Sequence, residues 1–287
     1  MMKAKIKGIV TIVALAGFNA IVAGTACATP QLNEPFDEYA NGTTLDTTGN
    51  WTNFSGTTLP FTVNAGTVTA TNVGSGTTGE DDSNKFAAAP ITTGLLYLST
   101  LVTVPTGTTV TATNGDYFFA PYSTASSGGG YAARVYVAQG SAAGTVAFGL
   151  TTAAANTTNN PVNKTADLTL GTEYKLVIRY DITAKTATMG LFAPGTAVTL
   201  DSQLTVTSGT AGTVTGIDSV AIRQGAGAAF TTVIDGIQAG TTLADVSAIA
   251  TGSSTYFNAV PEPSSYALGA FALVVLSFSV RCHRRAA

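Results

Sequence analysis

The stretch of sequence that decides the fold is Tyr174-Lys175-Leu176-Val177-Ile178-Arg179-Tyr180-Asp181. Every second position, from Tyr174 to Tyr180, is aromatic or aliphatic, and most of the intervening positions are charged. An alternation with a period of two indicates a β-strand that turns one face toward a core. We therefore expect a strand over residues 173–181 with its aliphatic side chains buried.

Similar short runs, rich in Thr, Val, Tyr and Phe, lie on both sides of this one and favour strands. They cover residues 61–63, 67–71, 95–104, 117–122, 131–139, 145–150, 186–192, 219–224 and 230–238. Turn signals separate many of them, including Asn41-Gly42, Asn114-Gly115 and Asp235-Gly236. No stretch before the C-terminal tail has a long helical period. The predicted fold is therefore all-β, a two-sheet antiparallel jelly-roll sandwich.

Composition limits the partners of this domain. Charged residues make up 10% of the 287 residues, against roughly 25% in an ordinary soluble domain. The formal net charge is −3, and no cluster of Lys or Arg lies between the two termini. Nucleic-acid binding needs a basic footprint, so we expect none here.

The N-terminus predicts a secretory signal peptide over residues 1–28. Lysines at positions 3, 5 and 7 precede an apolar stretch from Gly8 to about Gly24, which ends in Ala26-Cys27-Ala28. A basic start, an apolar middle and an Ala-x-Ala ending are typical of such peptides, with cleavage after Ala28. A lipoprotein signal centred on Cys27 is the alternative, and Gly24 disfavours it.

The C-terminus has three parts in order. Pro261-Glu262-Pro263 precedes an uncharged segment at 266–280, and Arg281, Arg284 and Arg285 form a basic end. Fifteen helical residues span about 22 Å, less than the ~30 Å hydrocarbon core of a bilayer. We expect a short transmembrane helix that anchors the protein temporarily. The basic flanks at both ends place everything between them outside the cytoplasmic membrane.

This tail, residues 260–287, resembles the PEP-CTERM sorting signal of Gram-negative bacteria. The resemblance implies that an exosortase recognises Pro261, Glu262 and Pro263 and processes the tail during export to the cell surface or extracellular matrix. A plain single-pass anchor after a proline-rich linker remains the alternative.

The main domain shows a second resemblance, in the order of its features. The opening Phe36-Asp37-Glu38-Tyr39 and Asn50-Trp51 are followed by the strand patterns at 131–137 and 174–180 and by Ile234-Asp235-Gly236-Ile237 near the end. This order is similar to the concanavalin A-like lectin/glucanase fold in its laminin-G-like versions. The resemblance implies one domain over residues 29–248 and a linker at 249–259. It does not by itself imply sugar binding.

The residue inventory of the domain excludes several kinds of catalysis. His283 is the only histidine, and Cys27 and Cys282 are the only cysteines. Without them the domain cannot form a Ser-His-Asp triad, a cysteine nucleophile or a zinc site with nitrogen and sulfur ligands. Glucanases that share the fold carry Glu-x-Asp-x-x-Glu, and the nearest match, residues 80–85, ends in Lys85. We expect no enzyme, with a glycoside hydrolase or polysaccharide lyase as third choice.

The same segment supplies candidate calcium ligands. Glu80, Asp81 and Asp82 offer the hard oxygen atoms that Ca²⁺ prefers. They stand in a Gly/Ser/Thr-rich stretch that we expect to be a turn. The favoured interpretation is a solvated acidic loop that adds solubility, so no cofactor is assigned and Ca²⁺ stays a candidate.

Aromatic and basic side chains suggest where a glycan could bind. Arg134 and Tyr136 share one face of an expected strand, opposite Tyr131, and could line an open sheet surface together with Tyr117. The alternative is that these aromatic residues pack in a core or an interface. We expect Trp51 to fill the core near the first strand.

The sequence thus predicts an exported, non-enzymatic surface or matrix protein with one lectin-like domain for extracellular polysaccharide. A structural or adhesive envelope protein with no specific glycan ligand is the alternative. The sequence specifies neither the ligand nor the oligomeric state.

Overall fold

The computed structural model describes residues 30–74, 79–111, 113–125, 130–152, 163–193, 196–200, 204–206, 214–225 and 227–247. The chain divides into two compact units, residues 28–260 and a second made of 1–27 with 261–287. The expected signal peptide at 1–28, the linker at 249–259 and the tail at 260–287 lie outside the described residues. Among those that are described, no helix has both the length and the apolar character needed to cross a membrane.

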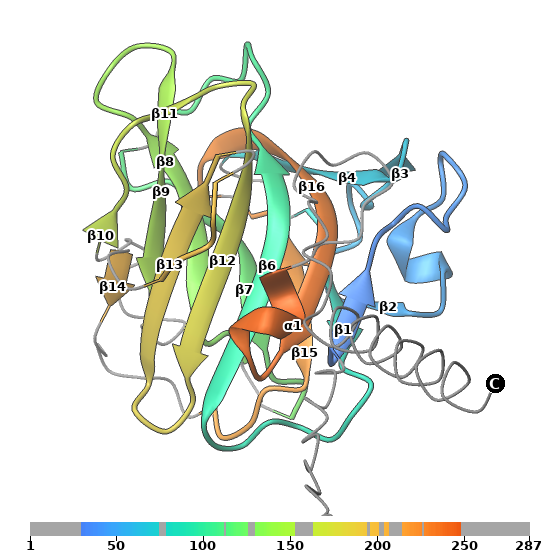
Figure 1. Ribbon diagram of the computed structural model, residues 1–287. Helices are drawn as coiled ribbons and strands as arrows, with labels where there is room; N and C mark the ends of the chain where they lie inside the picture. The colour runs from blue at the N-terminus through green and yellow to red at the C-terminus, as the bar shows by residue number, and fades with distance from the viewer. Residues whose placement is uncertain are drawn as a thin grey trace, which may run out of the picture. The chain divides into compact units, whose positions relative to one another are not determined.

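The described strands form two antiparallel sheets, one in front of the other in Figure 1. The first sheet has the spatial order β14 (Leu204–Val206), β13 (Thr186–Phe192), β12 (Glu173–Asp181), β6 (Leu95–Thr103), β16 (Ala229–Gly240), β4 (Thr67–Val73) and β3 (Val63–Asn64), and β1 (Leu32–Glu34) also pairs with β16. The second has the order β10 (Asn163–Lys164), β9 (Thr145–Thr151), β8 (Arg134–Gln139), β7 (Asp116–Tyr122), β15 (Ser219–Arg223), β5 (Asp81–Lys85) and β2 (Trp51–Ser55), and β11 (Leu168–Thr169) pairs with β9. The predicted all-β, two-sheet class is confirmed.

The central strand of the prediction is confirmed with its expected bounds. Leu176 and Ile178 of β12 are fully buried in the core between the sheets. Aromatic rings join the two layers there, since Phe118 of β7 meets Phe230 of β16 edge-on at a centroid distance of 6.5 Å. The alternation therefore identified the face of β12 that packs between the two sheets, because an apolar face can lose its water without a polar partner.

Two expectations about local structure are wrong. The run at 61–63 contributes only Val63 to a strand, β3. Asp235-Gly236, expected as a turn, lies inside β16, where the register with β6 shifts between Asp235 and Ile237. Gly236 has φ +51°. A glycine at positive φ suits a β-bulge as well as a hairpin turn, and so the dipeptide alone does not distinguish the two.

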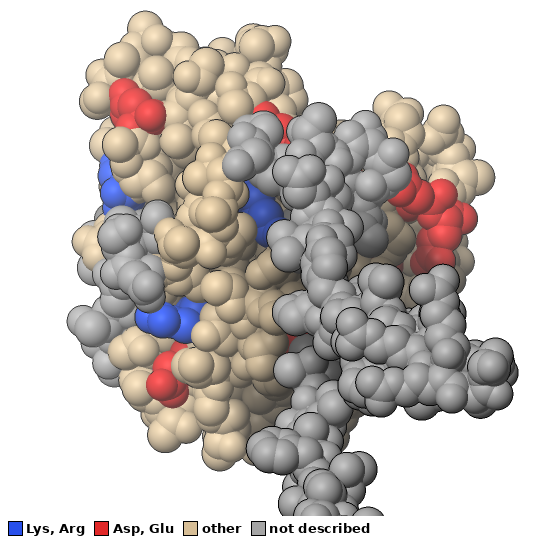
Figure 2. Space-filling view, in the orientation of Figure 1, with Lys and Arg blue, Asp and Glu red and all other residues tan. Residues whose placement is uncertain are grey.

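The outer face of the first sheet is covered over part of its area. The one-turn helix α1 (Leu243–Ser247) lies over β6 and β16 (Figure 1). Its Val246 belongs to the same buried apolar cluster as Val177 of β12, and Ser99 Oγ donates a hydrogen bond to the Val246 carbonyl at 2.9 Å. On the face seen in Figure 2, charged side chains cover little of the surface, and acidic side chains form a patch at its right-hand edge.

Candidate functional site

The strongest concentration of functional side chains lies on the outer face of the second sheet. We call it the aromatic–arginine cluster. Its members are Phe54, Tyr117, Tyr122, Tyr131, Tyr136, Arg134, Arg223, Asp81 and Asp116. Strands β2, β5, β15, β7 and β8 lie side by side in this sheet, which is why residues far apart in the sequence meet here.

The rings of the cluster form a continuous row across the face, each in contact with the next. Phe54 stacks on Tyr122 at a centroid distance of 4.5 Å, and Tyr131 lies 5.1 Å from both Tyr122 and Tyr117. Tyr136 follows at 5.6 Å from Tyr117. Burial raises the pKa of the Tyr117, Tyr131 and Tyr136 phenols, so they are neutral hydrogen-bonding groups at neutral pH.

Two guanidinium groups flank Tyr117. The Arg223 Cζ atom is 4.1 Å from the centroid of the Tyr117 ring, and the Arg134 Cζ atom is 4.8 Å from it. The Arg134 Cζ atom is also 5.4 Å from the Tyr131 centroid. Cation–π contacts of this kind hold each guanidinium against a ring face.

Arg223 has anionic partners. Its Nη1 donates to Asp116 Oδ1 at 2.9 Å, and its Nε lies 3.7 Å from Asp81 Oδ2. Burial raises the pKa of Asp81 to about 6, although the Arg223 charge opposes this shift. The Tyr131 hydroxyl donates to Asp81 Oδ2 at 3.3 Å. Arg223 and the two aspartates thus form a buried ionic network at one end of the cluster.

Asp116 is held on both of its oxygens. Besides Arg223, its own neighbour Tyr117 donates a backbone N–H to Oδ1 at 2.8 Å. The Gly227 N–H donates to Oδ2 at 2.9 Å, and Asn72 Nδ2 reaches the same oxygen at 3.4 Å. A carboxylate with this many donors is fixed in position.

Arg134 differs from Arg223 in its hydrogen bonding. Its Nε and Nη2 have no hydrogen-bond partner among the described residues, and neither does the Tyr136 hydroxyl. Arg134 and Tyr136 are two residues apart on β8, so their side chains leave the same face of the strand. This end of the cluster therefore contains buried donors that have no acceptor among the described residues.

The structure corrects two details of the predicted glycan site. Arg134 and Tyr136 do share a face with Tyr117, as expected, but they are only 2% and 0% exposed, so the surface is not open. Tyr131 lies on their side and not opposite, because β8 begins at Arg134 and the residues before it do not continue the alternation. Alternation with a period of two predicts the side of the sheet to which a side chain points only for residues within the strand.

The expectation for Glu80, Asp81 and Asp82 is also wrong. Residues 81–85 form β5 and are not an exposed loop, and all three acidic side chains are buried. Asp81 joins the aromatic–arginine cluster, whereas Glu80 accepts hydrogen bonds from Asn53 Nδ2 at 2.5 Å and from the Phe61 N–H at 3.1 Å. The described part of the chain contains no group of three or more His, Cys, Asp or Glu side chains that could hold a metal ion.

Asp82 is buried on the other side of β5. It is 0% exposed, and neither carboxylate oxygen has a hydrogen-bond partner among the described residues. Burial, with further contributions from Glu80, Asp46 and Asp81, raises its pKa to about 8. Asp82 therefore carries a proton at neutral pH.

Trp51 fills the core, as expected. It is 2% exposed, stacks on Phe36 at 5.9 Å and donates its indole N–H to Glu34 Oε2 at 3.0 Å. The Glu34 carboxylate also accepts from Tyr39 and Asn84, so this buried acid is satisfied by neutral donors. Its role is to organise the start of the domain.

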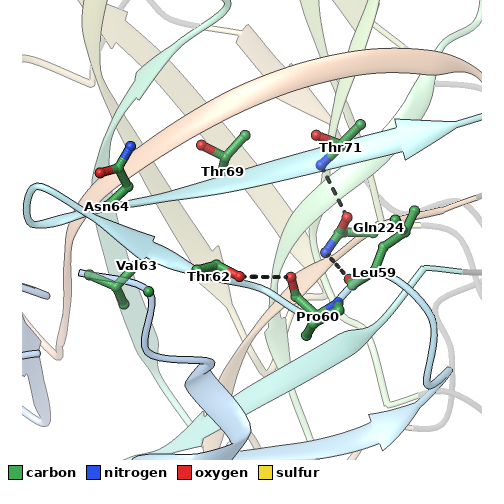
Figure 3. Close-up of a pocket in the computed structure, with 9 residues that line it drawn as sticks. Leu59, Pro60, Thr62, Val63, Asn64, Thr69, Thr71 and Gln224 are labelled. Carbon is green, nitrogen blue, oxygen red and sulfur yellow. Dashed lines mark hydrogen bonds between the residues drawn. The ribbon is translucent and has the colours of Figure 1, made fainter. Parts of the chain in front are cut away.

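A second feature is a pocket of about 620 Å³ at the β3–β4 edge of the first sheet (Figure 3). β3 pairs with β4 only at Thr67 and Val68. Beyond this pair, the Gln224 side chain connects β4 to the segment that precedes β3. Gln224 Nε2 donates to the Leu59 carbonyl at 2.7 Å, and Gln224 Oε1 accepts from the Thr71 N–H at 3.2 Å. The lining, which includes Leu59, Thr69 and Thr71, has no charged side chain.

Sequence reasoning missed several members of the cluster. Arg223 and Phe54 were not singled out, and Asp81 was assigned to a loop. The signal for Arg223 was present, since it lies in the expected strand 219–224 two residues after Ala221 and therefore on the same face. Its pairing with Asp81 depends on the β15–β5 register, which no local pattern specifies.

Comparisons with known proteins give one match in sequence and several in structure. Residues 259–285 match the family model described as the PEP-CTERM protein-sorting motif. No protein with curated function matches the sequence. This motif implies export, sorting to the cell envelope or surface, and processing by exosortase.

Similar solved structures include a sialidase, at 8% identity and a TM-score of 0.47, covering 75% of this chain. This chain spans only 19% of that sialidase. The endo-1,3-beta-glucanase from Streptomyces sioyaensis is 13% identical, with a TM-score of 0.48 and coverage of 76% of this chain and 97% of that one. The carbohydrate recognition domain of Emp47p is 9% identical, with a TM-score of 0.44 and coverage of 75% and 97%.

Proposed function

We propose that this exported protein uses its β-sandwich as a non-catalytic, lectin-like module that binds extracellular polysaccharide. The sorting motif at 259–285 supports the delivery of the protein to the cell surface or extracellular matrix. One observation supports the binding function above all. A row of aromatic rings on one sheet face packs beside Arg134 and includes Tyr136, and the Arg134 Nε and Nη2 atoms and the Tyr136 hydroxyl have no hydrogen-bond partner among the described residues.

The chemistry of sugars fits this arrangement. A sugar ring presents apolar C–H groups on its faces and hydroxyl groups around its edge. Aromatic side chains supply platforms for the former, and a few fixed polar groups recognise the latter. We propose Arg134, Tyr136 and Tyr117 as glycan contacts, with Tyr131 added because it packs against Arg134.

The absence of catalysis is part of the proposal. Glycoside hydrolysis needs one carboxyl group that delivers a proton and a second that acts as base or nucleophile. Asp116 is held by four donors, and Asp81 lies beside Arg223. Carboxylates in such contacts are oriented toward the protein, and we propose that they organise the cluster without reacting with substrate.

We further propose how the protein reaches its place. In a Gram-negative bacterium, the segment at 266–280 would hold the exported chain in the membrane until exosortase processes the tail. Arg281, Arg284 and Arg285 would keep the end of the segment on the cytoplasmic side.

A structural or adhesive role is the second candidate, and burial of the cluster favours it. Tyr117, Tyr122 and Tyr131 are 7–9% exposed, as expected for rings that serve only packing. In that case the domain is a stable spacer without a specific glycan ligand.

A glycan array with the full chain in a neutral detergent tests the proposal, once with calcium and once with a chelator. We expect selective binding that falls at least about 10-fold in Tyr117→Leu, because a ring platform contributes on the order of 1–3 kcal/mol. Tyr97→Leu, on β6 of the other sheet, is the matched control and should bind normally.

A blank array from a protein that melts cooperatively would refute carbohydrate binding and favour the structural role. Binding that disappears with the chelator would show a calcium requirement. Release of reducing ends or unsaturated sugars from the bound polysaccharide would refute the non-catalytic part of the proposal.

A further inference from the structure

Arg134 is unusual among the buried ionisable groups of this domain. Four charged residues, Arg134, Lys175, Asp82 and Glu34, are at most 2% exposed and have no oppositely charged ion-pair partner among the described residues. Neutral donors satisfy the Glu34 carboxylate. Lys175 can lose its proton and Asp82 can gain one. A guanidinium stays charged at any pH at which a protein is folded, so Arg134 cannot become neutral by losing a proton.

The surroundings of Arg134 satisfy its charge only in part. The ring faces of Tyr117 and Tyr131 attract the cation, at 4.8 and 5.4 Å from the guanidinium carbon. Ring faces do not accept the in-plane N–H bonds of Nε and Nη2, however, and these remain without partners in the described part of the chain. A buried charge with unmade hydrogen bonds is costly, and it needs a functional explanation.

The neighbouring carboxylates are engaged elsewhere. Asp116 and Asp81 both contact Arg223, and neither forms an ion pair with Arg134. The anion that would satisfy Arg134 must therefore come from outside the cluster.

The two Arg134 nitrogens without partners, Nε and Nη2, indicate which kind of anion fits. Two parallel N–H groups of a guanidinium match the two oxygens of a planar carboxylate. The Tyr136 hydroxyl, two residues along the same face of β8, is a further unused donor. The rings of Tyr117 and Tyr131 lie beside Arg134, where the sugar that carries the carboxylate would pack.

From this geometry we infer that the polysaccharide bound at the aromatic–arginine cluster is acidic, with uronic-acid carboxylates, and that Arg134 and Tyr136 grip one carboxylate. This inference rests on the proposed carbohydrate-binding function and specifies its ligand class. Attraction by overall charge does not explain such binding, since the chain carries a formal net charge of −3.

The experiment compares one polymer in two chemical forms. The full chain in a neutral detergent is titrated with polygalacturonate and with the same polymer after its carboxyl groups are reduced to primary alcohols. We expect the acidic form to bind about 10- to 100-fold more tightly, which is the range for a hydrogen-bonded charge pair. Dextran sulfate, which has charge without planar carboxylates, should bind more weakly than polygalacturonate.

Variants then assign the preference to named atoms. Arg134→Met should weaken binding of the acidic form by about 10- to 100-fold and so remove the preference for it, and Tyr136→Phe should weaken acidic binding by about 3- to 10-fold. Arg179→Met is the matched control, because Arg179 is a partly exposed arginine on β12 of the other sheet. It should leave both affinities unchanged.

The outcomes separate the two proposals. Equal binding of both polymer forms would overturn the acidic-ligand inference and leave carbohydrate binding intact. An equal loss in Arg134→Met and Arg179→Met would also overturn it, because it would show non-specific charge attraction. A failure to bind any glycan would refute the proposed function itself.

Discussion

Each of the two sheets has a buried basic side chain on its outer face, and the two side chains differ in their hydrogen-bond partners. On the first sheet, Lys175 of β12 is 1% exposed and donates its amine to the Ser247 carbonyl at the end of α1. On the second sheet, Arg134 of β8 is 2% exposed, and two of its nitrogens have no acceptor among the described residues.

The difference teaches how a structural cation can be told from a functional one. A cation at the C-terminus of a helix satisfies a carbonyl that the helix leaves open, so the contact with Lys175 completes the fold. Arg134 completes no element of the fold. The same degree of burial therefore has a structural explanation on one face and calls for an external partner on the other.

The largest loss of stability should come from the paired arginine. Arg223→Met leaves Asp116 and Asp81 buried without their cation, which costs about 3–5 kcal/mol of unfolding free energy. Urea unfolding followed by tryptophan fluorescence measures this. The control Arg179→Met should lose less than about 1 kcal/mol, and equal losses in both variants would show that the ionic network does not stabilise the fold.

The second prediction concerns Asp82, a buried carboxyl group without a hydrogen-bond partner among the described residues, which we expect to be neutralised by binding a proton. Its pKa is raised to about 8, so the folded state holds a proton that the unfolded state releases near pH 4. The stability it contributes is present at pH 4 and is lost as the pH rises through about 8. Asp82→Asn should match the wild type at pH 4 and be more stable by about 5 kcal/mol at pH 9.

Denaturant titrations of both proteins at pH 4, 6, 8 and 9 provide the measurement. A constant difference between Asp82→Asn and the wild type across this range would contradict the protonated, buried carboxyl. Asp181→Asn, on β12 of the first sheet, is the control for the loss of one acidic side chain.

Lys175 has the opposite pH dependence. Burial lowers the pKa of its amine to about 8, so between about pH 8 and 10.5 the unfolded state binds more protons than the folded state. Stability from this group is fully present above the unfolded pKa and is lost as the pH falls through about 8. Relative to Lys175→Met, the wild type should gain about 2 kcal/mol of unfolding free energy from pH 8 to pH 10.

The comparison with Lys175→Met cancels the ionisation of tyrosines, which both proteins share. A difference that stays flat over this range would mean that the amine is accessible to water. Hydrogen exchange of residues 243–247 at pH 7 should also be faster in the variant, because α1 loses the lysine contact at its end.

The smallest effect on stability should belong to Arg134. Arg134→Met replaces an incompletely bonded buried cation with an apolar chain of similar length, so the unfolding free energy should change by less than about 1 kcal/mol, or rise. Together with the large loss in Arg223→Met, this result would separate the two arginines of one cluster. A loss of several kcal/mol in Arg134→Met would assign Arg134 to the structure.

The sequence predicted the parts of this fold that depend on local pattern. The alternation at 173–181 identified β12 and its buried face, because side-chain direction in a strand follows from backbone geometry alone. It also placed Arg134 and Tyr136 on one face of β8. It did not reveal that Lys175 and Val177, on the other face of β12, are covered by α1, since that depends on where a distant segment packs.

The errors share one physical cause. Glu80, Asp81 and Asp82 looked like a solvated loop because acidic residues are rarely buried. Asp81 and Asp82 lie in β5, and Glu80 directly precedes it. Arg223 and Tyr131 supply partners for Asp81, and Asn53 and the Phe61 N–H supply partners for Glu80, all from other parts of the chain. Asp235-Gly236 looked like a turn because a glycine at positive φ occurs in turns and bulges alike. In each case the deciding contacts are non-local.

The position of β16 has a mechanical consequence. The twelve-residue strand β16 pairs with β6 on one side and with β4 and β1 on the other. The described part of the domain ends at Ser247, one short helix later. A force that pulls on the chain beyond Ser247 meets the contacts of Ser99 and Lys175 with α1 first. It then acts along β16, where the ladder bonds are loaded together in shear and do not open one at a time, so the domain is built to resist tension applied through its C-terminal end.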